Sequence, residues 1–257
     1  QIAHVTLCRA EKHNALDMQM FYEIDNTITK LRKNTNIRAI IVSGDGEDFC
    51  SGLDIKSVIK SPTNGLKLLF KLLPWRSNLA QRVSTGWKSI PVPVIMAIHG
   101  RCWGGGLQIA LGGDFRIATP NASLSIMESR WGLIPDMGGT IALQKLVGLD
   151  IAKELAMTAS IIDGNKALEL SLISHVDNAP LFKAQQLAEI IIEQSPDSVA
   201  ATKRLYNKSW TSSNGMMLLR ESYYQIKILL GKNQNIKTYN QLHLGQDKKG
   251  FKQRQKW

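Results

Sequence analysis

The chain has 257 residues, 44% of them hydrophobic and 21% charged, and its formal net charge is +11. This length accommodates a core with an appendage, and we expect a core over residues 1–195 and a helical region over residues 196–257. The three cysteines, Cys8, Cys50 and Cys102, lie too far apart in the sequence for a zinc site or a disulfide framework. We therefore expect no bound metal and a cytoplasmic location.

The apolar and basic residues restrict the partners of the chain. No apolar run approaches the about 20 residues that span a bilayer, and the first residues lack the pattern of a signal peptide, so we expect no membrane partner. The basic residues are mostly dispersed, with a concentration in residues 248–257. This distribution favours a solvated surface, although an anionic ligand would also suit it. Nucleic acid is disfavoured because basic and aromatic residues are not interleaved.

The N-terminal half alternates short β-branched runs with helical patterns. The spacing predicts a strand over residues 2–8, a helix over residues 17–32 capped by Asp17, and a strand over residues 37–42. Residues 55–89 are helical in pattern but are interrupted by proline and glycine, which indicates a mobile cover.

Strands follow in quick succession from residue 92. We predict strands over residues 92–99 and 114–118, with a short glycine-opened helix between them that ends at Leu111. This order indicates a twisted α/β core. Trp75, Trp87 and Trp103 could line an apolar pocket or pack in the core.

The chain becomes mostly helical after Thr140. Ser195 and Pro196 predict a helix start with a serine cap, and residues 214–230 have apolar residues at helical spacing. Two interpretations of this last helix remain open, an interface or ordinary helix core. They concern the apolar residues Met216, Met217, Leu219 and Tyr223.

Two glycine-centred stretches carry most of the chemical information. Residues 51–56 follow one predicted strand, and residues 100–108 follow another and open a helix. Glycines at such junctions let the backbone approach a ligand closely, and the first N–H groups of a helix have no intrahelical acceptor. Because negative charge is favoured there, the two stretches together could supply two backbone donors to one oxyanion.

These stretches resemble the paired signature segments of the crotonase superfamily, the enoyl-CoA hydratase/isomerase proteins. Residues 127–140 resemble the third signature of the family, and residues 163–173 resemble a later one, with Ser171 where glycine is usual. The resemblance implies an α/β spiral of β-β-α units with a C-terminal helical trimerisation region. It also implies a homotrimer or a dimer of trimers, and a role in fatty-acid β-oxidation. The implied substrate is a coenzyme A thioester, with no permanently bound cofactor.

The same resemblance implies roles for individual residues. The amides of Leu53 and Gly105 would form the oxyanion hole, each donor contributing roughly 3 kcal/mol to transition-state stabilisation. Coenzyme A would contact Ser51, Leu53, Asp54 and Ile55. Glu128 would be an acid/base.

Two positions decide between reactions within the family. Gln108 stands where hydratases have their first glutamate, and a primary amide can orient water or substrate but cannot accept a proton at neutral pH. Asp136 stands where dienoyl-CoA isomerases have an aspartate, although it could instead cap a helix that starts near Gly138. We therefore predict (di)enoyl-CoA isomerisation through Glu128 and Asp136. The alternatives are hydration of a 2-enoyl-CoA, and a non-catalytic acyl-CoA-binding or RNA-binding member of the family.

Overall fold

The computed structural model describes residues 1–59, 61–244 and 247–257. Its centre is a parallel five-stranded sheet in the order β1-β2-β3-β5-β7. The strands are β1 (Ile2–Leu7), β2 (Ala39–Gly44), β3 (Val94–Ile98), β5 (Phe115–Ala118) and β7 (His175–Val176). The four predicted strands are present, with ends that differ from the prediction by up to two residues.

A second layer of short strands lies beside this sheet. It pairs β4 (Arg101–Trp103) with β6 (Ser123–Ser125), again in parallel, and single bridges join Cys50 to Cys102 and Leu16 to Leu53. Thus β2, β3 and β5 are each followed within a few residues by a segment of the second layer. This repeated step is the predicted spiral of β-β-α units.

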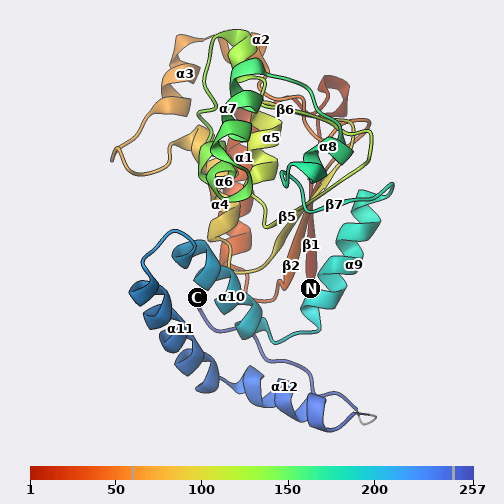
Figure 1. Ribbon diagram of the computed structural model, residues 1–257, viewed down its shortest axis with the longest axis vertical. Helices are drawn as coiled ribbons and strands as arrows, with labels where there is room; N and C mark the ends of the chain where they lie inside the picture. Colours follow the sequence, from red (N-terminus) through yellow and green to blue (C-terminus); the bar gives the residue numbers. More distant parts are fainter. Residues whose placement is uncertain (60, 245–246) are drawn as a thin grey trace.

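Helices cover both faces of the main sheet (Figure 1). The first half of the chain contains η1 (Ala10–Lys12), α1 (Met18–Lys33), α2 (Ile55–Ile59), α3 (Pro62–Leu69), α4 (Leu79–Ser89), α5 (Gly105–Leu111) and η2 (Glu128–Trp131). The second half contains α6 (Gly139–Leu146), α7 (Leu149–Thr158), α8 (Gly164–Glu169), α9 (Pro180–Ile192), α10 (Pro196–Ser209), α11 (Asn214–Leu229) and α12 (Lys232–Leu242). As predicted, Asp17 caps α1, and its side chain accepts a 2.9 Å hydrogen bond from the amide of Met20.

Alternate residues of the strands enter two different cores. In β2, Ile40 and Val42 belong to the large core that also contains side chains of α1 and α4. The neighbouring residues Ala39 and Ile41 face the other way, into a smaller cluster with Ala184 and Ala188 of α9. A parallel sheet buried on both faces requires such continuous apolar strands.

The last three helices lie at one end of the molecule, below the sheet in Figure 1. Ser195 occupies the N-cap position of α10 as predicted, but its side chain makes no capping hydrogen bond. Residue 195 was the expected end of the core. The helical region that follows it contacts the core directly, because Lys203 of α10 forms a 2.6 Å ion pair with Asp114. Asp197 also ties the C-terminal tail to α10, since it accepts hydrogen bonds from the side chain of Asn233 and the amide of Gln255.

Helix α11 leaves apolar side chains uncovered. Leu219 and Tyr223 are each 60% exposed, and Met216 is 42% exposed. The interpretation of these residues as helix core is therefore wrong for the single chain. Among the described residues, no helix combines the length and the apolar character needed to cross a bilayer.

Candidate active site

Glu128 and Gln108 form the centre of the site. Glu128 is the first residue of η2, which begins after the two residues that follow β6, and Gln108 lies on α5. The amide of Gly104 donates a 2.9 Å hydrogen bond to the carbonyl of Ser125, and this contact brings the start of α5 beside η2. The side-chain amide of Gln108 then donates a 2.5 Å hydrogen bond from Nε2 to Oε1 of Glu128.

Gln108 is held in one orientation by the backbone of the next loop. Its Oε1 accepts hydrogen bonds from the amides of Met137, at 2.9 Å, and Gly139, at 3.0 Å. Two donors fix this atom as the carbonyl oxygen, so Nε2 must face Glu128. Because Gln108 is only 1% exposed, it lies behind Glu128 rather than on a cavity wall.

The second carboxyl oxygen of Glu128 has no such contact. Oε2 is buried and has no hydrogen-bond partner among the described residues. Burial raises the pKa of Glu128 above its usual value; the hydrogen bond from Gln108 opposes the rise, and the charge of Asp136 adds to it. A buried carboxyl oxygen without a partner is a candidate proton-transfer atom.

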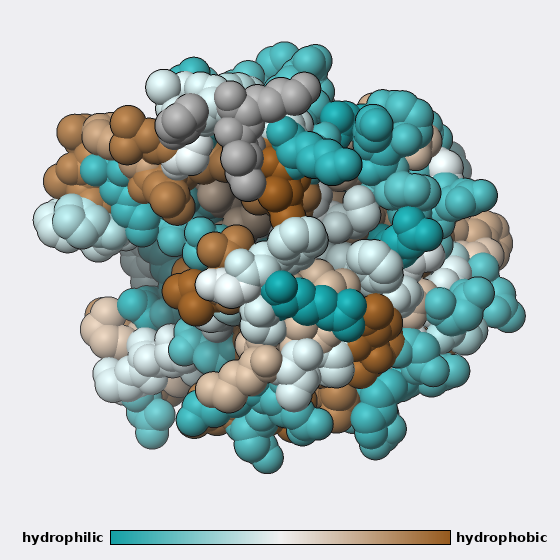
Figure 2. Space-filling view, turned by 90° about the horizontal axis from the view of Figure 1, so that it is seen from above, coloured by the Kyte–Doolittle hydropathy of each residue, from teal (hydrophilic) through white to brown (hydrophobic). Residues whose placement is uncertain are grey.

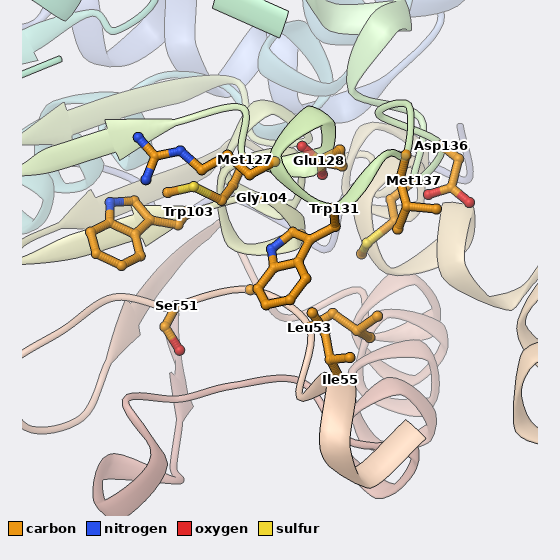
Figure 3. Close-up of a pocket in the computed structure, with 14 residues that line it drawn as sticks. Ser51, Leu53, Ile55, Trp103, Gly104, Met127, Glu128, Trp131, Asp136 and Met137 are labelled. Carbon is orange, nitrogen blue, oxygen red and sulfur yellow. The ribbon is translucent and has the colours of Figure 1, made fainter. Parts of the chain in front are cut away.

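Asp136 lies on the loop that leads into α6. Burial raises the pKa of its carboxyl group as well, although the residue remains exposed to solvent. The N-cap of α6 is Gly138, so the interpretation of Asp136 as the helix cap is wrong. In Figure 3, Met137 lies between the carboxyl groups of Asp136 and Glu128.

Leu53 and Gly105 bring two backbone N–H groups to the same cavity. Gly105 is the first residue of α5, and among the described residues neither amide donates a backbone hydrogen bond. Gly52 has a φ of +95°, and a Cβ on it would lie 2.9 Å from the carbonyl oxygen of Trp103 and 3.5 Å from the amide nitrogen of Gly105. Only a glycine permits this close approach of the two segments.

A cavity of about 430 Å³ joins these groups (Figure 3). Six of the predicted site residues line it: Ser51, Leu53, Ile55, Gly105, Glu128 and Asp136. Asp54 does not line it, because its carboxylate forms a 2.9 Å ion pair with Arg9 and accepts a hydrogen bond from the amide of Ser57. The structure thus favours a local structural role for Asp54.

The three tryptophans that could have lined an apolar pocket lie in different places. Trp103 lines the cavity, whereas Trp87 is fully buried in the core, where its indole donates a hydrogen bond to the carbonyl of Val83. Trp75 is 79% exposed and lies outside the cavity lining.

The wall opposite Leu53 comes from residues that we did not predict as site residues. Figure 3 shows the indole of Trp131 projecting toward Leu53 and Ile55. The signal was present in the sequence, since these residues surround Glu128 in the third signature segment. The unpredicted lining residues are Met127, Arg130, Trp131, Leu133 and Met137.

Comparisons with known proteins agree with this architecture. Residues 1–235 match the family model for enoyl-CoA hydratase/isomerase. The chain is 35% identical over 230 residues to YngF of Bacillus subtilis (strain 168), an enoyl-CoA hydratase/isomerase by name, and the match covers 87% of this chain and 85% of the relative. It is 29% identical over 218 residues to the mitochondrial Delta(3,5)-Delta(2,4)-dienoyl-CoA isomerase of Dictyostelium discoideum, covering 80% and 73%.

A solved structure with the same fold is an enoyl-CoA hydratase from Bacillus anthracis. Its TM-score is 0.85 at 28% identity, and the match covers 94% of this chain and 92% of that one. Both a hydratase and an isomerase are therefore among the proteins to which the chain is similar.

Proposed function

Because this chain belongs to the enoyl-CoA hydratase/isomerase family of the crotonase superfamily, we propose that it isomerises the double bonds of an unsaturated acyl-CoA thioester, with Glu128 and Asp136 as the acid/base pair. One observation carries the choice of reaction. The cavity is lined by two carboxyl groups of raised pKa, Glu128 and Asp136, while Gln108 places an amide where hydratases have their first glutamate.

The proposed reaction starts at Oε2 of Glu128. This oxygen takes a proton from the carbon next to the thioester carbonyl, and the electron pair of the broken C–H bond enters the conjugated system. Asp136, in its protonated form, returns a proton at the far end of that system. The product differs from the substrate only in the position of its double bonds. The cycle closes when Glu128 releases the proton that it took and the exposed Asp136 takes one from solvent.

The amides of Leu53 and Gly105 would stabilise the intermediate. Charge that leaves the carbon gathers on the thioester oxygen, and two preorganised N–H donors without other partners suit that oxyanion. The wall formed by Trp103, Met127 and Trp131 would keep water away from the enolate.

Hydration is the alternative reaction, because the family also contains hydratases. The amide side chain at position 108 makes hydration less favourable. Hydration needs a base that takes a proton from water and an acid that protonates carbon. Gln108 cannot act as either, and one of its two N–H groups is already donated to Glu128. Glu128 would then have to perform both proton steps.

The proposal includes the assembly and the location. The exposed apolar side chains of α11 support a homotrimer or a dimer of trimers through the C-terminal helices. Free thiols at Cys8, Cys50 and Cys102 suit a reducing cytoplasm. We expect only the acyl-CoA substrate in the cavity, and no resident cofactor.

A parallel assay tests the proposal. Purified protein is given a 2-enoyl-CoA, a 3-enoyl-CoA and a 3,5-dienoyl-CoA, and Asp136→Asn and Glu128→Gln are measured beside the wild type. We expect turnover of the dienoyl substrate to fall at least about a hundredfold in each variant, the usual contribution of one general acid or base. Fast hydration of the 2-enoyl substrate that does not change in Asp136→Asn would overturn the isomerase proposal in favour of the hydratase.

A further inference from the structure

The end of α3 and the loop after it present apolar side chains to solvent. We call residues 66–76 the α3 rim. Five of its large apolar side chains are more than half exposed, with Leu72 at 86% and Trp75 at 79%; the full set is Leu66, Leu69, Phe70, Leu72 and Trp75. Leu68, only 6% exposed, belongs to the large core. Leu68 therefore anchors the α3 rim to the fold, while the five other apolar side chains face solvent.

The α3 rim lies on the outside of the molecule. Figure 1 places α3 and the following loop at the end opposite the C-terminal helices. Seen from above, apolar side chains gather at the left edge, on the side where Figure 1 shows α3, with hydrophilic side chains among them (Figure 2). None of the exposed residues lines the active-site cavity.

All charged residues within the α3 rim are basic. Lys67, Lys71 and Arg76 alternate with them, and no aspartate or glutamate occurs in the sequence between Asp54 and Asp114. Among the described residues, these three cations form no ion pair with a carboxylate. Leucine, phenylalanine and tryptophan mixed with lysine and arginine are typical of segments that lie in the interface of an anionic membrane.

We propose that the α3 rim binds peripherally to an anionic lipid surface, with Leu72 and Trp75 inserted among the acyl chains and Lys67, Lys71 and Arg76 at the headgroups. The sequence led us to expect no membrane partner, because it contains no spanning segment. Interfacial binding needs only a short amphipathic segment, so the two statements concern different kinds of contact. The inference does not depend on the reaction that the active site catalyses.

The charge argues against a second copy of the chain as the partner. A twofold contact through the α3 rim would bury the three cations of each copy in one interface, where the segment has no acidic residue to pair with them. A lipid surface with acidic headgroups supplies the opposite charge together with an apolar layer.

Vesicle co-sedimentation of the full-length protein tests the proposal. The vesicles contain phosphatidylcholine alone, or phosphatidylcholine with about a third phosphatidylglycerol. Three variants are compared with the wild type: Leu72→Ser/Trp75→Ser, Lys67→Ala/Lys71→Ala, and the control Leu149→Ser/Met157→Ser. The control residues are 71% and 72% exposed, but acidic residues share their helix, with Asp150 next to Leu149 and Glu154 three residues before Met157.

We expect the wild type and the control to bind the anionic vesicles and not the neutral ones. Loss of two lysines should weaken binding about thirtyfold, the effect of two basic residues at an anionic surface, and Leu72→Ser/Trp75→Ser should abolish it. Activity on a short-chain acyl-CoA should stay within twofold, which shows that the variants are folded.

Other outcomes would overturn the proposal. They are absence of wild-type binding, equal binding to both kinds of vesicle, or equal weakening in the control. Gel filtration without lipid provides one further check: a concentration-dependent increase in mass that disappears only in Leu72→Ser/Trp75→Ser would assign the α3 rim to contacts between copies of the chain.

Discussion

Replacement of Gln108 by glutamate should increase the rate at which the site hydrates a 2-enoyl-CoA. In the structure, Oε1 of Gln108 accepts two backbone hydrogen bonds and Nε2 donates one to Glu128. A carboxylate of the same length keeps both acceptor contacts, with Met137 and Gly139. It loses only the donor, so the two carboxyl groups would meet where the amide and Glu128 now lie 2.5 Å apart.

The effect can be estimated from that contact. Two carboxyl groups so close cannot both ionise, so the pair shares one proton near neutral pH. Glu128, which faces the cavity, can then take a proton from water while the proton held between the two carboxyl groups is available for the substrate carbon. General acid/base groups contribute about 10²- to 10⁴-fold to a rate, so kcat for hydration of a 2-enoyl-CoA should rise at least about a hundredfold over the wild type.

The assay follows the loss of ultraviolet absorbance of the conjugated thioester. A matched control is Gln108→Met, which keeps the length of the side chain but leaves the buried amides of Met137 and Gly139 without an acceptor. Each unsatisfied group costs about 1–3 kcal/mol, so this variant should melt at a lower temperature and gain no hydratase activity. If folded Gln108→Glu binds the coenzyme A product but hydrates no faster than the wild type, our account of residue 108 is wrong.

Three further predictions concern stability, backbone geometry and assembly. Glu128 has a raised pKa in the folded chain, so its ionisation opposes folding, and stability is lost as pH rises from about 4.5 through the folded pKa. The melting temperature of Glu128→Gln should therefore match that of the wild type near pH 4 and exceed it at pH 8; an equal difference at both pH values would contradict the linkage. Gly52→Ala should lose about 1–3 kcal/mol of unfolding free energy, because φ is +95° and the new Cβ would meet the carbonyl of Trp103; chemical denaturation measures this, and an unchanged midpoint would refute it. Leu219→Lys/Tyr223→Lys should reduce the mass seen by light scattering to that of a monomer, whereas an unchanged mass would place the interface elsewhere.

The sequence predicted the local features of the fold well. Strand positions follow from β-branched runs, and the cap at Asp17 follows from a side chain that has only to reach an amide three residues away. The cap at Ser195 was wrong in detail, because tertiary packing buries its hydroxyl without a partner among the described residues. Boundaries and caps are thus predictable only where local contacts decide them.

The sequence predicted which residues belong to the candidate site better than it predicted how they contact one another. The glycine-centred segments indicated that Leu53 and Gly105 would meet, but no local pattern could show that Gln108 would be tied to Met137 and Gly139. That tie joins residues 29 and 31 positions apart. Trp131 lies in the third signature segment, but the sequence did not show that its indole would face Leu53 and Ile55 across the cavity.

The proposed oxyanion donors are main-chain groups on successive turns of the spiral. Substitutions of side chains and changes of the backbone path therefore have different consequences for evolution. Substitutions on the wall, at Ile55, Met127 or Trp131, can alter which acyl group fits while both N–H groups stay in place. Loss of the donors themselves requires a change of backbone path, as at Gly52. A descendant of this chain can therefore acquire new substrates by single substitutions and still inherit the capacity to form an enolate.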